Sequence, residues 1–179
     1  MKSLQLSSPH IIAMVGVPGA GKSQFAAEFS KMFHAPWLDS GLLEALSEDT
    51  ERVQQTSGAL LQEMMKTRQT ILFEGATERR SWRAELGRMA RANGYNILFV
   101  WVQADASTAK HRWLKQRRGE VEQFEQKIKQ FSPPHDSEPY IVISGHHTFN
   151  TQAKTLLRQL AETRPRVAPE RTATRLRVV

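Results

Sequence analysis

The feature that most constrains this chain is the octapeptide GVPGAGKS at residues 16–23, which fits the pattern G-x-x-x-x-G-K-[ST] of a phosphate-binding P-loop. The apolar run IIAMV at residues 11–15 precedes it and has the length of a buried strand. Residues 23–29 follow it with the apolar spacing of an amphipathic helix. Strand, glycine-rich loop and helix are the setting that the motif requires, so a glycine-rich turn without a ligand is the less favoured interpretation.

The spacing of the motif has a chemical reason. Glycines allow backbone N–H groups to converge on phosphate oxygens, at a helix N-terminus whose dipole favours an anion. In this arrangement Lys22 reaches the β- and γ-phosphates and the Ser23 hydroxyl binds Mg²⁺. We therefore expect ATP and Mg²⁺ as ligands. The expected nucleotide contacts are Gly16, Val17, Pro18, Gly19, Ala20, Gly21, Lys22, Ser23 and Gln24.

Length and composition predict one soluble globular domain. The chain has 179 residues, of which 40% are hydrophobic and 24% are charged. It contains no apolar run of about 18 residues and no long apolar core near its N-terminus, so we expect neither a membrane span nor a signal peptide. It also contains no cysteine, which excludes disulfides and thiolate metal sites. These features favour a cytoplasmic protein.

The net charge of +7 is concentrated at one end of the chain. Residues 163–179 carry five arginines and one glutamate, which contribute +4 and leave +3 for the rest. We therefore expect a globular domain over residues 1–162 and a basic, flexible tail over residues 163–179. Contact of this tail with RNA or DNA is one interpretation, and a solvated tail without a partner is the other.

Hydrophobic patterning predicts an α/β protein in which strands alternate with helices. Such alternation predicts a three-layer P-loop NTPase fold, with a five-stranded parallel sheet flanked by helices and a helical lid. The third predicted helix has an apolar stripe of Val53, Leu60, Leu61, Met64 and Met65, which indicates core packing. The predicted strands are 11–15, 37–38, 70–75, 96–102 and 139–143, and the other predicted helices are 22–33, 42–46, 78–93, 105–118, 121–131 and 150–161.

Polar residues follow each predicted strand, at the carboxyl edge where parallel sheets bind ligands. Glu74 ends an apolar run and resembles a Walker B acid, which binds Mg²⁺ through water or orients a nucleophile. Its alternative role is to cap the next helix. Asp39 is placed to accept a proton from a substrate hydroxyl, and its alternative is again a helix cap. The remaining residues at this edge are Ser40, Thr77, Gln103, Asp105 and residues 144–147.

Two groups of cations are candidates for binding phosphate or acceptor. Lys110, His111, Arg112, Lys115, Arg117 and Arg118 precede Gly119 in a predicted lid. We expect Arg112 and Arg117 to stabilise charge on the transferring phosphoryl group, and a solvated helix face is the alternative. Arg79 and Arg83, with Arg80 between them, follow Glu74 and are candidates to hold an anionic acceptor.

The pair His146-His147 suggests a metal site at first sight. Adjacent histidines without a third spaced ligand are a poor zinc pattern. The loop is more consistent with a border of the adenine site.

The order of these features resembles the small P-loop kinases related to polynucleotide kinase and zeta toxin, a group with an AAA-type, P-loop kinase-like domain. Chloramphenicol phosphotransferase, gluconate kinase and shikimate kinase are relatives in that group. The resemblance covers about residues 9–162 and rests on the P-loop, Asp39, residues 74–77, the arginines from 112 to 118, and residues 143–145. It implies an ATP-dependent kinase whose lid arginines and late strand enclose the nucleotide.

The sequence departs from that family at two places. Residues 40–44 contain no arginine of the kind that grips an acceptor phosphate in polynucleotide kinases. The family has a D-x-T-N-like turn whose aspartate aligns with Glu74 in one alignment and with Gly75 in another. If the aspartate aligns with Gly75, Glu78 stands at the position of the family's asparagine. A polynucleotide 5′-hydroxyl is therefore not implied as the acceptor.

Two functions remain open at this point. The first is a phosphotransferase that moves the γ-phosphate of ATP to a hydroxyl of a small molecule, a nucleoside or nucleotide, or a nucleic-acid end. The second is a nucleotide-regulated ATPase that binds RNA or DNA without kinase activity. The chain has no Asn-Lys-x-Asp sequence for guanine, no second ATPase subdomain and no transporter signature, which argues against those P-loop classes.

Overall fold

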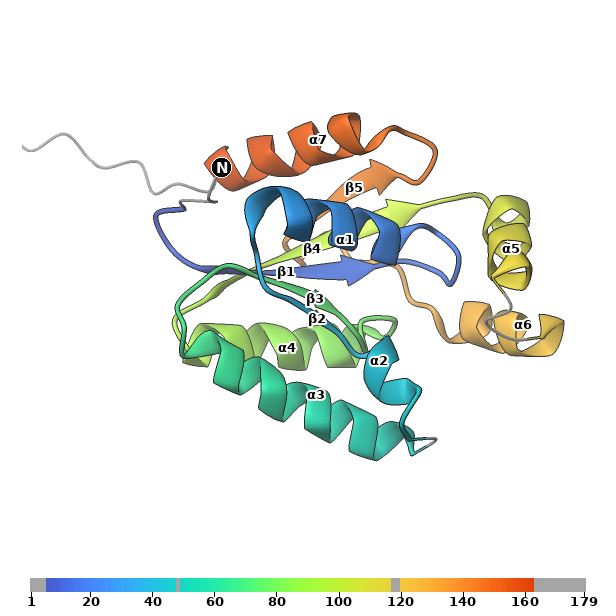
Figure 1. Ribbon diagram of the computed structural model, residues 1–179, viewed down its shortest axis with the longest axis horizontal. Helices are drawn as coiled ribbons and strands as arrows, with labels where there is room; N and C mark the ends of the chain where they lie inside the picture. The colour runs from blue at the N-terminus through green and yellow to red at the C-terminus, as the bar shows by residue number, and fades with distance from the viewer. Residues whose placement is uncertain (1–5, 48, 117–119, 163–179) are drawn as a thin grey trace, which may run out of the picture.

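The computed structural model describes residues 6–47, 49–116 and 120–162 of the chain. Its centre is a five-stranded sheet in the order β2-β3-β1-β4-β5, and every adjacent pair of strands is parallel (Figure 1). The fold class predicted from the alternation of strands and helices is confirmed. The strands are β1 (His10–Val15), β2 (Trp37–Asp39), β3 (Ile71–Glu74), β4 (Asn96–Gln103) and β5 (Tyr140–Ser144).

Two helical layers cover the two faces of the sheet. Along β1, Ile12 and Met14 pack in one apolar cluster with α1 (Lys22–Phe33) and α7 (Phe149–Glu162). The alternate residues of β1 pack in a second cluster with α3 (Thr50–Met65) and α4 (Arg80–Ala92). This division follows from the two-residue period of a strand, which turns successive side chains to opposite faces. Figure 1 shows α1 and α7 on one side of the sheet and α3 and α4 on the other.

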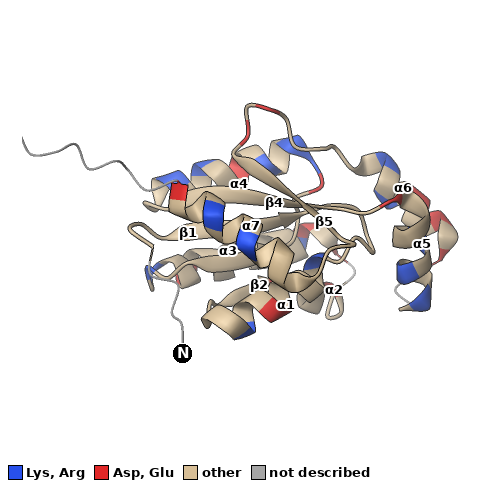
Figure 2. Cartoon of the chain, turned by 90° about the horizontal axis from the view of Figure 1, so that it is seen from above, with Lys and Arg blue, Asp and Glu red and all other residues tan. Residues whose placement is uncertain are grey.

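The remaining helices lie beyond the carboxyl ends of the strands. Helices α5 (Ala106–Lys115) and α6 (Val121–Gln130) pack on each other through Ala109, Trp113 and Phe124, whose side chains form a small separate cluster. Figure 2, seen from above, shows this helix pair standing at one end of the sheet. The short α2 (Gly41–Glu44) follows β2. The described residues of the predicted lid therefore form a pair of helices.

Two expectations about the helices need correction. The stripe of α3 contains Val53, Ser57, Leu61 and Met65, whereas Leu60 is 41% exposed. The buried residues recur every four positions, and Leu60 lies about 100° around the helix from Leu61, outside the stripe. The helix predicted over 42–46 ends at Glu44.

Some predictions fall outside the residues that the structure describes. These are the last part of the helix predicted over 105–118, of which α5 covers Ala106–Lys115, and the tail at 163–179. Within the described ranges, no helix has both the length and the apolar character needed to cross a membrane.

Candidate functional site

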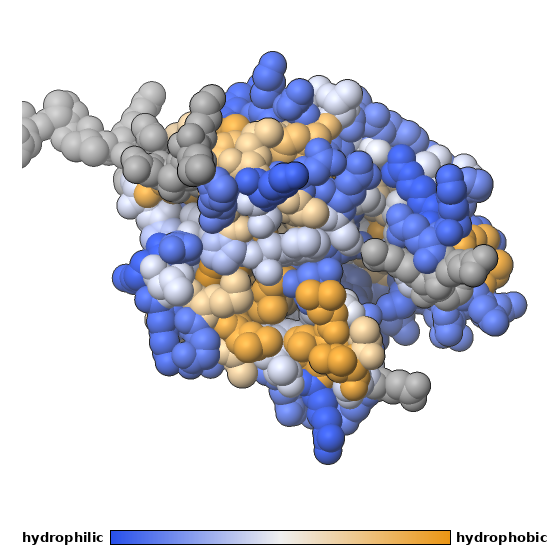
Figure 3. All heavy atoms as spheres, viewed as in Figure 1, coloured by the Kyte–Doolittle hydropathy of each residue, from blue (hydrophilic) through white to orange (hydrophobic). Residues whose placement is uncertain are grey.

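A cleft of about 1910 Å³ lies at the carboxyl edge of β1, β2 and β3. The P-loop and the ends of these strands form its centre, α2, α3 and α4 line one side, and α5 and α6 line the other. Apolar side chains gather over α2 and the turn after it in Figure 3, where Leu42 is 69% and Leu46 is 83% exposed. An exposed apolar surface thus borders the cleft at α2.

The P-loop has a backbone that requires glycine at defined positions. Gly16 and Gly19 have φ angles of 146° and 76°, which side chains rarely adopt. A Cβ on Gly16 would lie 2.6 Å from the carbonyl oxygen of Val102 in β4, and a Cβ on Gly19 would overlap the carbonyl of Ala109 in α5. The loop is therefore held closely between the sheet and the lid. Helix α1 begins directly after it, so the N–H groups of its first turn face the cleft.

Lys22 and Ser23 are positioned by the start of α1. The ammonium of Lys22 donates hydrogen bonds to the carbonyl oxygens of Gly16 (3.0 Å) and Val17 (3.1 Å), which places its charge over the loop. The Ser23 hydroxyl donates to Oε1 of Glu74 at 2.9 Å, although the two residues are 51 positions apart. A hydroxyl and a carboxylate are oxygen ligands of the kind that Mg²⁺ prefers. The two predicted metal ligands, Ser23 and Glu74, therefore lie together at the P-loop end of the cleft.

Asp39 lies next to Glu74, because these residues are register partners at the ends of β2 and β3. Its Oδ1 accepts a hydrogen bond from the backbone N–H of Gly41 at 2.9 Å, at the start of α2. The residue at the N-cap position is Ser40, whose N–H and hydroxyl both donate to the carbonyl oxygen of Glu74 (2.8 and 3.0 Å). Asp39 therefore combines a local turn contact with a place in the cleft wall.

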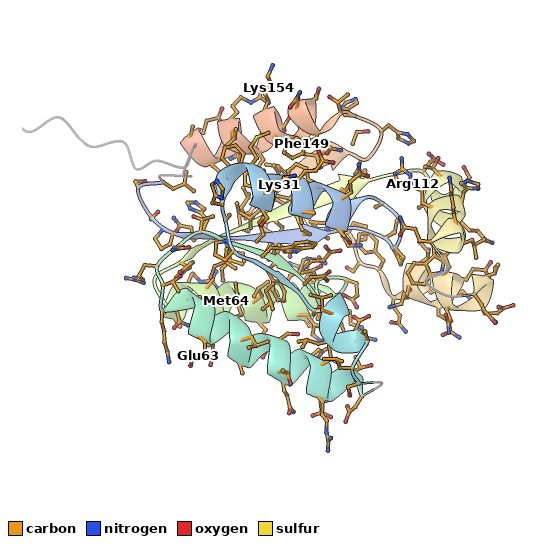
Figure 4. The ribbon with its side chains drawn as sticks, viewed as in Figure 1. Lys31, Glu63, Met64, Arg112, Phe149 and Lys154 are labelled. Atoms are coloured by element: carbon orange, nitrogen blue, oxygen red, sulfur yellow. The ribbon has the colours of Figure 1, made fainter. Side chains whose placement is uncertain are left out.

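Arg112 is the lid cation that the structure places beside the P-loop. Its two terminal nitrogens donate to the carbonyl oxygen of Gly145, each at 3.3 Å, and one of them lies 3.9 Å from the position that a Cβ on Gly21 would occupy. Figure 4 labels Arg112 on α5, at the end of the sheet where the cleft opens. Arg117, its predicted companion, lies outside the described residues.

Arg79 and Arg83 have different positions, and the prediction for Arg83 is corrected here. Arg79 is exposed at the mouth of the cleft, with its guanidinium 4.8 Å from the ring centroid of Trp82. Arg83 is fully buried and faces away from the cleft, in a bidentate ion pair with Glu138 (2.8 and 3.0 Å). Its guanidinium also donates to the carbonyl oxygens of Thr77, Ser132 and Pro133. Because these contacts use its donors, Arg83 does not hold an acceptor.

Electrostatics support the structural role of this pair. Burial alone raises the pKa of Glu138, but hydrogen bonds from Arg83 and from the backbone N–H of His135 outweigh it and lower the pKa overall. The carboxylate therefore stays ionised, and the pair fixes the segment before β5 to α4.

The loop after β5 is tied to the loop after β4 through a polar contact. His146 Nε2 lies 2.9 Å from Oδ2 of Asp105, the N-cap residue of α5. Hydrogen bonds from the Ser107 hydroxyl and the Thr108 backbone N–H hold the pKa of Asp105 well below its usual range. His147 contributes only a backbone contact to Ser144. Within the described ranges, no group of three or more histidine, cysteine, aspartate or glutamate side chains that could hold a metal ion is found.

Sequence reasoning missed several residues of the cleft wall. Ser57 is only 4% exposed, and its hydroxyl has no hydrogen-bond partner in the described structure. A serine in the apolar stripe of α3 is the signal that could have indicated it. Other overlooked residues are Trp82 and a series of amide side chains, namely Gln54, Gln55, Gln62, Gln116, Gln123, Gln126 and Gln130.

Comparison with solved structures places the fold among small kinases. The chain superposes on a gluconokinase from Sinorhizobium meliloti with a TM-score of 0.68 at 16% identity, covering 88% of this chain and 94% of that one. It superposes on the Mycobacterium tuberculosis APS kinase, solved with AMPPNP and APS, with a TM-score of 0.70 at 14% identity, covering 86% and 98%. A deoxyadenosine kinase from M. mycoides gives 0.54 at 16% identity, covering 85% and 99%. At these identities the similarity establishes a kinase-like P-loop NTPase fold.

Family models add a sequence-level match, whereas no curated protein matches the chain. A model described as an AAA domain matches residues 11–134, more than half of the chain, from β1 through the lid helices. The predicted resemblance to small P-loop kinases is thereby confirmed. The chain belongs to this AAA domain family, in its P-loop kinase-like form.

Proposed function

We propose that this protein is an ATP- and Mg²⁺-dependent phosphotransferase that phosphorylates a hydroxyl group. One observation carries the proposal: a single cleft holds the P-loop lysine, the Ser23–Glu74 pair, Asp39 and Arg112. Phosphoryl transfer needs positioning and charge stabilisation more than covalent chemistry from the protein, and these residues supply both.

The donor half of the site would hold the triphosphate. The loop amides and the N-terminus of α1 favour a phosphate anion. Lys22 has its ammonium over the loop carbonyls of Gly16 and Val17, from where a side-chain rotation would carry it to the β- and γ-phosphates. Arg112 reaches the P-loop from the lid and would stabilise the charge on the transferring group.

The Ser23 hydroxyl and the Glu74 carboxylate fit Mg²⁺ by the chemistry of their donor atoms. When bound, the ion would neutralise part of the charge on the β- and γ-phosphates. Ser23 would bind it directly and Glu74 through water. The Ser23–Glu74 hydrogen bond keeps both side chains in place at the end of β3.

Asp39 would accept the proton of the acceptor hydroxyl. Its carboxylate is half-buried at the end of β2, next to Glu74 and on the side of the cleft away from Arg112. Taking the proton as the oxygen attacks the γ-phosphorus is the general-base role. The acceptor therefore lies between Asp39 and the P-loop.

The experiment is transfer of labelled γ-phosphate from Mg·ATP to a panel of hydroxyl compounds by the full chain. We expect Lys22→Ala to reduce transfer by about 10²-fold or more, because the charge aimed at the transferring phosphate is lost. Lys31→Ala is the matched control, since Lys31 lies exposed on the same helix and outside the cleft wall (Figure 4). Transfer that survives Lys22→Ala would reject the proposal.

The alternative of a nucleotide-regulated RNA- or DNA-binding ATPase would use the arginines of the lid and of residues 163–179, and its motivation is the missing acceptor arginine and the undecided base. Residues 163–179 lie outside the described structure. Arg112 of the lid lines the same cleft as Lys22 and Asp39, which supports the kinase proposal.

A further inference from the structure

The charged side chains that line the cleft are separated by sign. On the side of the P-loop and the lid they are cations, and on the side of α2, α3 and α4 they are carboxylates with one arginine among them. Within the described residues, the cations of the first side are Lys22, Arg112 and Lys127, and the second side carries Asp39, Glu44, Glu51, Glu74, Glu78 and Glu85 with Arg79.

Four of these carboxylates have no part in the proposed transfer. Glu44, Glu51, Glu78 and Glu85 come from α2, the first turn of α3, the segment after β3, and α4. In the described part of the chain none of the four forms an ion pair within 4 Å. Arg79, the cation on this side, stacks on Trp82. The acceptor half of the cleft therefore carries a negative charge that no ion pair among the described residues neutralises.

A second observation points to a polar ligand in this half. Ser57 lies on α3, one turn after Val53, and lines the cleft, yet its buried hydroxyl makes no hydrogen bond to any described residue. Leaving a buried hydroxyl without a partner destabilises the folded state. A hydroxyl or ammonium group of a bound molecule would supply that partner.

We propose, on the basis of the phosphotransferase function above, that the acceptor is a polyhydroxylated compound bearing an ammonium group. The carboxylates of α2, α3 and α4 attract the ammonium, and Ser57 bonds one of the polar groups of the acceptor. One hydroxyl oxygen attacks the γ-phosphorus of ATP. An O–P bond to the acceptor forms, the bond between the γ-phosphorus and the β–γ bridging oxygen breaks, ADP leaves, and the hydroxyl proton passes to Asp39.

The same charges disfavour anionic acceptors. A nucleic-acid end, a nucleotide or a sugar acid brings negative charge to a surface that carries uncompensated carboxylates. Like charges in the same cleft repel, and the partly enclosed cleft screens this repulsion less than open solvent does. Arg83 does not offset it, because its guanidinium is committed to Glu138.

The test uses acceptors matched in size and different in charge. Glucosamine, glucose and gluconate form one series, and ethanolamine, ethylene glycol and glycolate form a second. We expect kcat/KM for transfer to follow the order ammonium, neutral, carboxylate, with about a tenfold or larger difference between the extremes. The advantage of the ammonium compound should shrink as salt rises from low ionic strength.

Variants of the carboxylates in the cleft wall test whether these residues cause the preference for ammonium-bearing acceptors. The double variant Glu51→Gln, Glu85→Gln should reduce the ammonium-to-neutral ratio of kcat/KM about fivefold or more while leaving the KM for ATP unchanged. Ser57→Ala, a small change in volume, should raise the KM for the acceptor. Glu63→Gln is the matched control, since Glu63 lies on α3, pairs with Lys66 and is not part of the cleft wall (Figure 4).

Each result separates this inference from the kinase proposal. Lys22-dependent transfer that prefers the carboxylate compounds, or that ignores charge, would overturn the inference and leave the kinase function standing. Transfer to none of the ammonium compounds, with Mg·ATP still bound in a Lys22-dependent manner, would also overturn it. Loss of nucleotide binding as well as transfer would count against the proposed function itself.

Discussion

At the scale of single residues, Arg83 is the side chain whose replacement should cost the most stability. It is fully buried, pairs with Glu138 through two hydrogen bonds, and donates to three backbone carbonyl groups. In Arg83→Met these carbonyl oxygens lose the guanidinium donors, and the half-buried Glu138 carboxylate loses its ion pair and keeps only the His135 N–H among the described donors. We expect the free energy of unfolding to fall by about 3–5 kcal/mol, measured by urea denaturation.

The control for this substitution is Arg88→Met, on the same helix at an exposed position. It should change the unfolding free energy by less than about 0.5 kcal/mol. If Arg83→Met cost no more than that control, Arg83 would not be the structural residue described above.

The difference between Arg83 and the P-loop shows which residues a sequence can reveal. The P-loop residues 16–23 are consecutive, so the glycine positions that the loop backbone requires can be recognised directly in the sequence. The structural role of Arg83 depends on its ion pair with Glu138, which lies 55 positions away in the sequence. Nothing in the neighbouring sequence distinguishes Arg83 from Arg79 or Arg80. The sequence likewise does not reveal that the Ser57 hydroxyl is buried without a hydrogen-bond partner among the described residues, because this depends on which side chains surround it in the folded protein.

At the scale of elements, the helix pair α5–α6 is the part that we expect to respond to nucleotide. Arg112 bonds the carbonyl oxygen of Gly145 through two long contacts of 3.3 Å, which hold it beside the P-loop without filling all its donors. The guanidinium can thus exchange this carbonyl for phosphate oxygens, which are stronger acceptors. The aromatic pair Trp113–Phe124, with ring centroids 6.4 Å apart, keeps the two helices together during that exchange.

We therefore expect Arg112→Lys to lower kcat for phosphotransfer by about 10³-fold, with a much smaller change in the KM for ATP, because the arginine contributes mainly in the transition state. Lysine lacks the planar pair of donors that spans two phosphate oxygens. Lys115→Ala, an exposed position of the same helix outside the cleft wall, should leave both constants unchanged. A KM effect without a kcat effect would instead indicate a role in ground-state binding.

The elements themselves were largely predictable because the central strands are nearly continuous apolar runs. Residues 11–15 and 96–102 read as buried strands, and β1 and β4 occupy the middle of the sheet. The short α2 was less predictable, since its four residues bury none of their side chains and leave Leu42 exposed. A helix without a buried face has no hydrophobic period to read.

At the scale of the whole molecule, stability should fall as pH falls, in two separate ranges. His10 is 3% exposed at the start of β1, and burial lowers its pKa below the ordinary 6.5 despite its hydrogen bond to the Ser8 carbonyl. Glu138 has a pKa below its ordinary 4.5, and Asp105 has a pKa below its ordinary 3.8. In each case the unfolded chain binds the proton more readily than the folded chain does. The His10 contribution is therefore lost as pH falls below about 6.5, and those of Glu138 and Asp105 only below about 4.5.

The range between pH 6.5 and 5 tests the His10 contribution, because it lies above the ordinary pKa of Glu138. There the free energy of unfolding should decline by at most about 1.4 kcal/mol per pH unit, because the unfolded chain binds one proton that the buried His10 imidazole of the folded chain does not. His10→Gln should flatten this slope, whereas His111→Gln, at an exposed position of α5, should retain it. Urea denaturation at half-unit steps of pH measures the slope directly. An unchanged slope in His10→Gln would mean that a group elsewhere in the chain takes up the proton on unfolding.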